Sequence, residues 1–394
     1  MKKILFDLRK IQPIGNTKFH GGGVYGKVVF ERLAQLVPEK LVAYYNPKLF
    51  LYPSVLSLIN EKNIEVIYSD KRGIMETADQ FDYVIYSPLI SSEYLINNRV
   101  TIIVTLHGIR DIECPTDKYR YWYNDIYTTP MRRFLYNFGV DKLKRYYDNK
   151  IKVKKVYQDY LRKFNAPNIH WITVSNHSKY LVLSFIPSLR DKKIPVMYSC
   201  DTAIGILSTE KITEYGKYYL MVSANRWIKN TIRGIMAFDQ LFSEVPDMEG
   251  KVVLTGVKDS SFSTYKIKNR ERFVFEGYVD EERLKALYRN AFLFFYPSLY
   301  EGFGYPPLEA MHQECPVACS YAAAMPEICG DAALYFNPYS ITEMKAKILQ
   351  MEDDEIREEF RKKGVIRQHF IAQKQELDLQ KLCEYIISFI DRSK

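Results

Sequence analysis

Short apolar runs alternate along the whole chain with longer stretches in which apolar residues recur at helical spacing. The runs that predict strands are Lys2–Leu8, Lys40–Asn46, Ile64–Ser69, Asp82–Pro88, Thr101–His107, His170–Val174, Tyr218–Val222, Val252–Thr255, Phe273–Val279 and Ala291–Tyr296. The stretches that predict helices include 24–36, 179–185, 232–242, 341–351, 354–370 and a last one ending near Ile390. This alternation predicts an α/β protein with parallel, doubly wound sheets.

The length of 394 residues accommodates two domains, each large enough for its own core. The polar stretch 201–217 is the expected linker, so we place a first domain at 1–200, a second at 201–372 and a last helix at 373–394. With 47% apolar and 26% charged residues, the composition is typical of a soluble globular protein. No apolar run is long enough for a membrane span or a signal peptide, which predicts a cytoplasmic protein.

The six cysteines show no spacing typical of a metal site. Cys315 and Cys319 form a lone C-x-x-x-C pair without a second pair or nearby histidines. We therefore expect reduced, mostly buried thiols and no bound metal.

The stretch from Ala291 to Pro338 carries the clearest chemical pattern. An unbroken apolar run predicts a buried strand, and the loop Gly302–Gly304 then leads into a helix that should begin at Pro306 and Pro307. Glycines let an anion approach the backbone, and the free N–H groups at a helix start point toward it. Glu301 and Glu309 bracket this loop. A carboxylate one turn into the helix can accept two hydrogen bonds from a ribose.

A second glycine pattern, Gly21-x-Gly23-x-x-Gly26, formally satisfies the dinucleotide-binding fingerprint. It would support an NAD-dependent sugar-nucleotide oxidoreductase or epimerase. However, the glycines follow their strand by about a dozen residues, and the next strand ends without the acidic residue that would bind a ribose. The pattern is therefore weak evidence for dinucleotide binding, and the family resemblance given below implies instead a flexible loop here that faces the cleft and the donor diphosphate.

The segment 131–164 holds eleven Lys or Arg residues against three Asp, with Tyr, Phe and Leu interleaved. Such a composition suits contact with an anionic membrane or with a phosphorylated acceptor. A solvated helical hairpin with lysines on its outer face is an equal alternative. Nucleic-acid binding is disfavoured, because no recognised binding motif accompanies the charge.

The pattern Glu301, seven residues, Glu309, with Gly-Phe-Gly between them, resembles the nucleotide-sugar site of family 4 glycosyltransferases, which are retaining enzymes of the GT-B fold. Met325–Leu334 is similar to the segment that follows in that family. The resemblance is dense from Tyr218 to Pro338 and thinner before it. It implies two Rossmann-like domains that face each other across a cleft, with the last helix crossing back to the first domain.

The resemblance also implies roles for individual residues. Glu309 would bind the ribose, and Lys229, Arg226 and the loop Gly302–Gly304 would bind the diphosphate. Glu301 would contact the donor sugar, with His107 opposite it, since Thr105–Glu113 is similar to the family's segment with a strand-end histidine. The other residues expected to line the substrate site are Gly22, Gly23, Gly256, Val279, Phe303 and Tyr305.

A retaining hexosyltransferase with a UDP- or GDP-sugar donor and a glycan or lipid-linked acceptor is the activity that follows from the resemblance. No metal cofactor is implied, because cationic side chains and a helix N-terminus take the place of a magnesium clamp. The alternative within the fold is an inactive GT-B subunit that docks on a membrane or partner through 131–164, which the intact Lys229, Glu301 and Glu309 argue against. Glycogen-phosphorylase-like enzymes share the architecture but have longer chains and a lysine-bound cofactor.

Overall fold

The computed structural model describes residues 2–13, 21–95, 97–120, 123, 141–200, 206–258 and 266–391, with 141–152 described only as part of a helix. The chain divides into two compact units. Unit 1 comprises Met1–Ile109, Tyr157–Thr202 and Ala372–Lys394, and unit 2 comprises Arg110–Val156 and Ala203–Ile371. The sequence analysis assigned 110–156 to the first domain, whereas in the structure this segment groups with unit 2.

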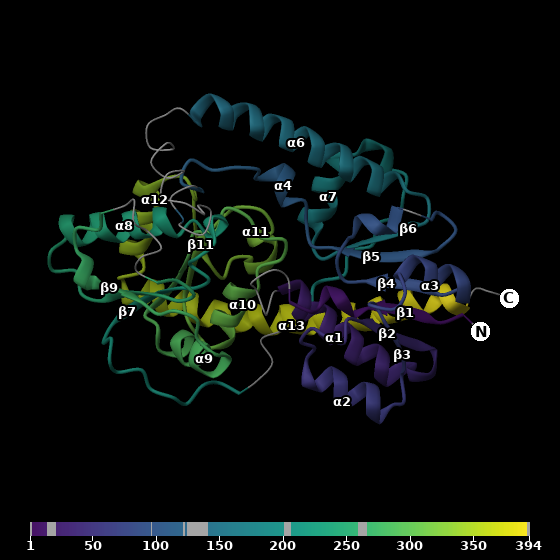
Figure 1. The fold of residues 1–394 in the computed structure, drawn as a ribbon. Coiled ribbons are helices and arrows are strands. Elements are labelled where there is room, and N and C mark those ends of the chain that lie inside the picture. Colours follow the sequence, from purple (N-terminus) through teal and green to yellow (C-terminus); the bar gives the residue numbers. More distant parts are fainter. Residues whose placement is uncertain are drawn as a thin grey trace. The chain divides into compact units, whose positions relative to one another are not determined.

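Unit 1 contains a parallel sheet of six described strands in the order β3-β2-β1-β4-β5-β6 (Figure 1). The strands are β1 (Ile4–Asp7), β2 (Leu41–Tyr45), β3 (Glu65–Tyr68), β4 (Val84–Ser87), β5 (Ile102–Leu106) and β6 (Ile169–Thr173). The helices are α1 (Gly21–Leu36), α2 (Pro53–Glu61), α3 (Ile74–Phe81) and α7 (Asn176–Phe185). Ser175 caps α7, because its side chain accepts a hydrogen bond from the Ser178 N–H.

Unit 2 repeats this topology in the order β12-β11-β10-β7-β8-β9. Its strands are β7 (Tyr218–Met221), β8 (Lys251–Leu254), β9 (Phe273–Phe275), β10 (Leu293–Tyr296), β11 (Val317–Ser320) and β12 (Leu334–Phe336). Its helices are α4 (Arg110–Glu113), α8 (Thr231–Glu244), α9 (Glu281–Asn290), α10 (Tyr305–His312), α11 (Met325–Cys329) and α12 (Ile341–Gln350). Two helices, α6 (Asp141–Asn165) and α13 (Asp354–Asp391), have residues in both units.

Short 3-10 helices complete the described structure at η1 (Leu8–Lys10), η2 (Pro38–Lys40), η3 (Ser92–Leu95), η6 (Pro187–Leu189), η7 (Trp227–Lys229) and η9 (Arg270–Arg272). All described strand pairs are parallel, and the central strands are buried along their whole length, as their apolar runs predicted. The predicted α/β fold with doubly wound sheets is thus confirmed.

Three local predictions were wrong. Gly21–Gly23 form the first turn of α1 instead of ending a flexible loop. A Cβ on Gly26 would lie 2.5 Å from Ile11 Cγ2, so this glycine lets α1 pack closely against that side chain. The predicted strand 273–279 ends at Phe275, after which Gly277 interrupts the apolar run. The two predicted C-terminal helices are the single helix α13, because 371–373 contain no helix-breaking residue.

No helix in the described part of the chain is both long and apolar enough to cross a membrane. All six cysteines fall within the described residues, and each is buried with a free thiol.

The continuity of α13 can be tested with Gln373→Pro. Gln373 is exposed, so the substitution removes little packing. A proline there removes one helical hydrogen bond and clashes with the preceding turn, which should lower the free energy of unfolding by about 3 kcal/mol or more. Urea denaturation of Gln373→Pro and of the control Gln373→Ala measures the difference. Equal stability of the two variants would mean that the helix is interrupted near residue 371.

Candidate functional site

The two central strands of unit 2 mark the point where its strand order reverses. β7 and β10 are neighbours, although the strands that follow each of them in sequence run to opposite edges of the sheet. In open α/β sheets, ligands bind at such a point, beyond the carboxyl ends of the strands. The loop after β7 carries Arg226 and Lys229, and the loop after β10 carries Glu301.

Hydrogen bonds join these two loops to each other. The Leu299 N–H donates to the Ile228 carbonyl at 2.8 Å, and the Ser298 hydroxyl donates to the same carbonyl at 3.2 Å. Asn230 follows Lys229 with a φ of 57°, a left-handed conformation that asparagine tolerates better than most residues. Its side-chain amide donates to the Pro297 carbonyl at 3.0 Å. The backbone around Lys229 is therefore tied to the loop that carries Glu301.

Lys229 and Glu301 form an ion pair that is almost withdrawn from water. Lys229 Nζ lies 2.6 Å from Glu301 Oε1, and the two side chains are 5% and 15% exposed. The hydroxyls of Tyr296 and Ser298 donate to the same oxygen, each at 2.7 Å, and Nζ also contacts the Tyr296 hydroxyl. Among the described residues, no hydrogen bond to Glu301 Oε2 is recorded. One carboxylate oxygen thus receives three donors.

Burial and pairing together set the charge of both groups. Burial lowers the pKa of Lys229 to about 8, although the Glu301 carboxylate opposes the shift. Burial alone would raise the pKa of Glu301, but Lys229 and the hydroxyls of Tyr296 and Ser298 outweigh it and hold that pKa below its usual value. Both groups are therefore charged at neutral pH.

The glycine loop after Glu301 leads directly into α10. Gly304 has a φ of 122°, and a Cβ there would lie 3.1 Å from Met325 Sδ, so a larger residue would strain both backbone and packing. Phe303 is buried, and its ring centroid lies 5.5 Å from that of Tyr305. α10 begins at Tyr305 with proline in its first turn, as predicted. The positive end of the helix dipole thus lies at this loop, although Pro306 and Pro307 carry no N–H group.

Glu309 lies one turn into α10. Its Oε2 accepts a hydrogen bond from the Tyr288 hydroxyl at 3.2 Å, which fixes the orientation of the carboxylate. Glu309 also acts to raise the pKa of Lys229, as Glu301 does. The two carboxylates that bracket the glycine loop therefore both lie within electrostatic reach of the same lysine.

The remaining residues predicted in unit 2 lie at the carboxyl ends of neighbouring strands. Arg226 is exposed, and its charge acts to lower the pKa of Lys229. Gly256 follows β8 with a φ of 75°, and a Cβ on it would lie 3.5 Å from Ser223 Cα in the loop after β7. Val279 is half-buried between β9 and α9. Unit 2 thus brings Arg226, Lys229, Glu301 and Glu309 into one electrostatic cluster.

Three predicted residues lie in unit 1. His107 follows β5, and its Nε2 lies 3.1 Å from the Pro88 carbonyl oxygen, so its Nε2–H donates a hydrogen bond to that oxygen. Its ring packs edge-on against Tyr25 at a centroid distance of 4.8 Å. Gly22 and Gly23 belong to the first turn of α1, and a Cβ on Gly22 would lie 2.9 Å from Leu89 Cδ2. All three lie beyond the carboxyl ends of the strands of unit 1.

The sequence analysis did not identify Tyr296, Ser298 and Tyr288 as parts of the site. Tyr296 ends a buried strand, Ser298 precedes Glu301 by three residues, and Tyr288 comes from α9. The signal that could have revealed the first two is a pair of hydroxyl groups at the end of an apolar strand, next to a carboxylate. Tyr288 has no such local signal, because its contact with Glu309 depends on how α9 packs against α10.

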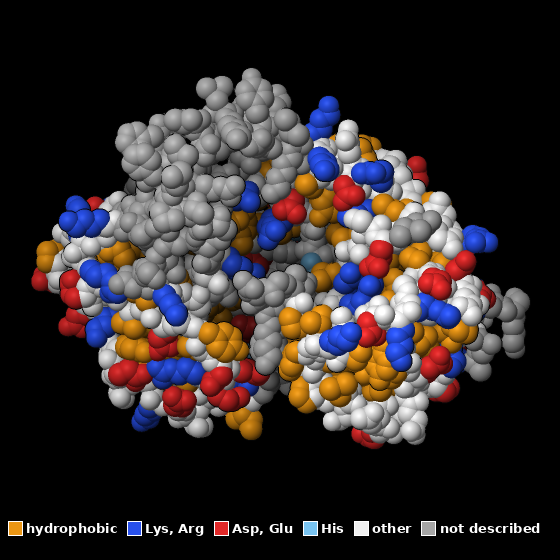
Figure 2. Space-filling view, viewed as in Figure 1, with side chains coloured by type: hydrophobic (Ala, Val, Ile, Leu, Met, Phe, Trp, Pro, Cys, Tyr) orange, Lys and Arg blue, Asp and Glu red, His pale blue; other side chains and the backbone are white. Residues whose placement is uncertain are grey.

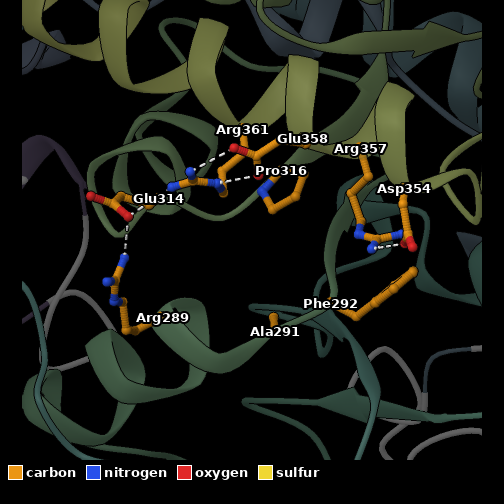
Figure 3. Close-up of a pocket in the computed structure, with 9 residues that line it drawn as sticks. All are labelled: Arg289, Ala291, Phe292, Glu314, Pro316, Asp354, Arg357, Glu358 and Arg361. Carbon is orange, nitrogen blue, oxygen red and sulfur yellow. Dashed lines mark hydrogen bonds and ion pairs between the residues drawn. The ribbon is translucent and has the colours of Figure 1, made fainter.

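A groove of 330 Å³ lies at the opposite ends of these strands (Figure 3). Ala291, Phe292 and Pro316 line it just before β10 and β11 begin. Its three arginines each pair with a carboxylate: Arg289 with Glu314 at 2.6 Å, Arg361 with Glu358 at 2.7 Å, and Arg357 with Asp354. Since these charges neutralise each other, the groove is a salt-bridge network. Within the described ranges, no three His, Cys, Asp or Glu side chains are grouped so as to hold a metal ion.

Comparison with known proteins finds a family match in the second half of the chain. Residues 208–366 match the family of Glycosyl transferases group 1. The chain is 32% identical over 202 residues to O-antigen chain mannosyltransferase B of Escherichia coli, which covers 48% of this chain and 52% of the relative. It is 28% identical over 191 residues to O-antigen chain mannosyltransferase RfbU of Salmonella typhimurium, covering 47% and 52%. The match thus spans about half the length of each relative.

Solved structures share the whole fold at low sequence identity. Anabaena Alr3699/HepE, solved in complex with UDP and glucose, has a TM-score of 0.62 and 15% identity, and the match covers 98% of this chain and all of that one. WaaG, a glycosyltransferase involved in lipopolysaccharide biosynthesis, has a TM-score of 0.62 and 12% identity over 97% of this chain and 99% of its own. These similarities confirm the predicted GT-B fold.

The buried pair predicts a pH-dependent loss of stability in Lys229→Met. Without Lys229, burial should raise the pKa of Glu301 in the folded protein above its pKa in the unfolded chain. At neutral pH the variant then holds an unpaired, buried carboxylate, which lowers its stability. Below the pKa of the unfolded chain Glu301 is protonated in both states, and this loss disappears. The free energy of unfolding should fall by about 3 kcal/mol near neutral pH and by clearly less near pH 4. Urea denaturation at both pH values measures it.

The control is Lys217→Met. Lys217 pairs with Glu352, and both side chains are about a quarter exposed, so we expect a loss of at most about 1 kcal/mol. Equal losses in Lys229→Met at both pH values would show that an unpaired Glu301 is not the cause.

Proposed function

We infer that the chain is a retaining glycosyltransferase that moves a hexosyl residue from a nucleotide diphosphate sugar to a hydroxyl group, and the match of residues 208–366 to the Glycosyl transferases group 1 family supports this. The observation that carries the proposal is the Lys229–Glu301 pair beside the glycine loop and the start of α10. It combines a cation, a helix N-terminus and a carboxylate with one free oxygen at the point where the strand order reverses.

Each group of this site has a role in the proposed donor complex. Lys229 and Arg226 would contact the diphosphate, together with the backbone of Gly302–Gly304 and the positive end of the α10 dipole. The Glu309 carboxylate, oriented by Tyr288, would accept hydrogen bonds from the two ribose hydroxyls. Glu301 Oε2 would accept a hydrogen bond from the donor sugar. Gly256 and Val279 would border the base.

The reaction that we propose is a substitution at the anomeric carbon. The acceptor oxygen forms a bond to the anomeric carbon while the bond between this carbon and the leaving phosphate oxygen breaks. The proton of the acceptor hydroxyl passes to the leaving phosphate. Negative charge develops on the diphosphate, and fixed cations close to it stabilise that charge. Glu301 already receives three hydrogen bonds on one oxygen and serves as a binding group rather than as a nucleophile. His107 of unit 1 would contact the transferred sugar.

The names of the curated relatives support a mannosyl residue as the transferred sugar and a bacterial surface polysaccharide as the product. The acceptor would then be a growing glycan, free or linked to a lipid. We propose that the reaction needs no metal ion, because Lys229, Arg226 and α10 supply the positive field. A transfer assay in excess EDTA tests this point, since a metal-dependent enzyme would lose its activity there.

Nucleotide binding tests the proposed function directly. Thermal shift and calorimetry with UDP, GDP, ADP and NAD should show stabilisation by UDP or GDP, because a ligand of the native state raises the apparent stability. Glu309→Ala should weaken that binding about tenfold to a hundredfold through the loss of hydrogen bonds to a charged group. Glu358→Ala, in the groove of Figure 3, is the matched control and should bind normally.

Other outcomes of this panel point elsewhere. Stabilisation by NAD alone would favour the oxidoreductase alternative at Gly21–Gly26. No stabilisation by any nucleotide would favour a binding subunit without activity. Lys229→Ala should abolish sugar transfer, and normal transfer in Lys229→Ala would overturn the site assignment.

We propose that the segment 131–164 makes a peripheral contact with an anionic membrane. Residues 131–140 lie outside the described residues, and the rest belongs to α6. On the visible described surface, cations and anions are interspersed (Figure 2), whereas this segment holds eleven cations against three anions. Co-sedimentation should be strong with vesicles that contain phosphatidylglycerol and weak with pure phosphatidylcholine. Equal binding to both would contradict an electrostatic contact.

A further inference from the structure

The chain segment that follows β5 docks onto the loops of the donor site in unit 2. Tyr123 is buried in the core of this unit beside α8, and its hydroxyl accepts a hydrogen bond from the Ile232 N–H at 3.3 Å. This N–H belongs to the first turn of α8, which begins two residues after Lys229. Cys114 packs with Ile228 and Leu299, one from each loop. The docked residues thus contact residues that precede and follow Lys229 in the sequence.

Asp117 of this segment forms a buried ion pair with Arg233. Arg233 Nη2 lies 2.7 Å from Asp117 Oδ2, and Nη1 lies 3.1 Å from Oδ1, so the pair is bidentate. The side chains of Arg233 and Asp117 are 3% and 6% exposed. The guanidinium group also lies over the rings of Tyr119 and Tyr339, 4.6 and 5.1 Å from their centroids. Its position is therefore fixed by charge and by stacking.

Arg233 passes this constraint on to the residue next to Lys229. Its Nη1 donates to Asn230 Oδ1 at 2.7 Å. The amide nitrogen of Asn230 donates to the carbonyls of Pro297, at 3.0 Å, and Pro338, at 2.7 Å. With both ends of its amide engaged, Asn230 is held in its left-handed conformation. The direction in which Lys229 leaves the backbone depends on that conformation.

We propose that Asp117 is a positioning residue for Lys229, acting through Arg233 and Asn230. The inference rests on the proposed function, in which Lys229 binds the diphosphate of the donor. A buried ion pair is weak evidence for stability, since apolar residues of similar size often serve as well. A requirement for a fixed lysine explains why two charges and an asparagine amide occupy this buried position. The sequence analysis placed Asp117 in the first domain, so the donor site includes a residue from outside 201–372.

The affinity ratio of nucleoside monophosphate to diphosphate tests the proposal. A misplaced Lys229 should weaken binding of the diphosphate group and leave the base and ribose contacts intact. Any loss of folded protein lowers the apparent affinity for both nucleotides equally, so it cancels in the ratio. With UMP and UDP, or GMP and GDP, calorimetry should show that Asp117→Asn reduces the preference for diphosphate about tenfold or more. Arg233→Lys, which keeps the charge but loses the bidentate geometry, should do the same.

Two further variants complete the experiment. Lys229→Ala should lose the preference for diphosphate, and adding Asp117→Asn to it should change the preference no further, because both substitutions act through the same lysine. Glu352→Gln, which breaks an ion pair with Lys217 in the same unit, should keep the wild-type preference.

The failures of the two proposals are distinguishable. An unchanged preference in Asp117→Asn and Arg233→Lys, together with its loss in Lys229→Ala, would overturn the positioning role alone. A wild-type protein that binds none of these nucleotides would overturn the proposed function, and the positioning role with it.

Discussion

A lysine and a glutamate held together out of water are the constraint on which the arrangement of unit 2 depends. Removing two charges from water costs several kcal/mol for each, and good geometry with further hydrogen bonds is needed to offset that cost. Tyr296 and Ser298 supply such bonds to Glu301, and the hydrogen bonds between the loops after β7 and β10 keep the partners in register. The arrangement is specific because the loops after β7 and β10 must both adopt one conformation for Lys229 and Glu301 to pair.

The burial of this ion pair also explains why Lys229 suits the binding of an anion. Burial lowers its pKa to about 8, so the free site holds its proton less firmly than an exposed lysine would. An arriving diphosphate favours the charged form and increases the attraction that the site offers. The Glu301 oxygen that pairs with Lys229 also accepts hydrogen bonds from two hydroxyl groups, so the ligand can compete for the ammonium protons.

Patterns of residues close in sequence predicted the strands and the helix starts, because short-range interactions determine these features. The apolar runs gave the positions of the central strands, Ser175 caps α7, and the prolines mark the start of α10. The glycine loop and its two carboxylates were found because they are close in sequence. The contact of Asp117 with Arg233 spans 116 residues, and no periodicity signals such a pairing. Likewise, the continuity of α13 depends on the absence of a helix breaker, which is a weaker signal than its presence.

The path of the chain has a consequence for exchanging parts between relatives. Unit 2 is assembled from two separate stretches, and the polypeptide passes between the units at 109–110, 156–157, 202–203 and 371–372. A chimera joined only near residue 202 would combine Arg233 of one parent with residue 117 of the other. Donor preference should therefore be inherited intact only when 110–156 travels with 203–371. The residues that form this site therefore come from two stretches that are separate in the sequence, and both must be exchanged together.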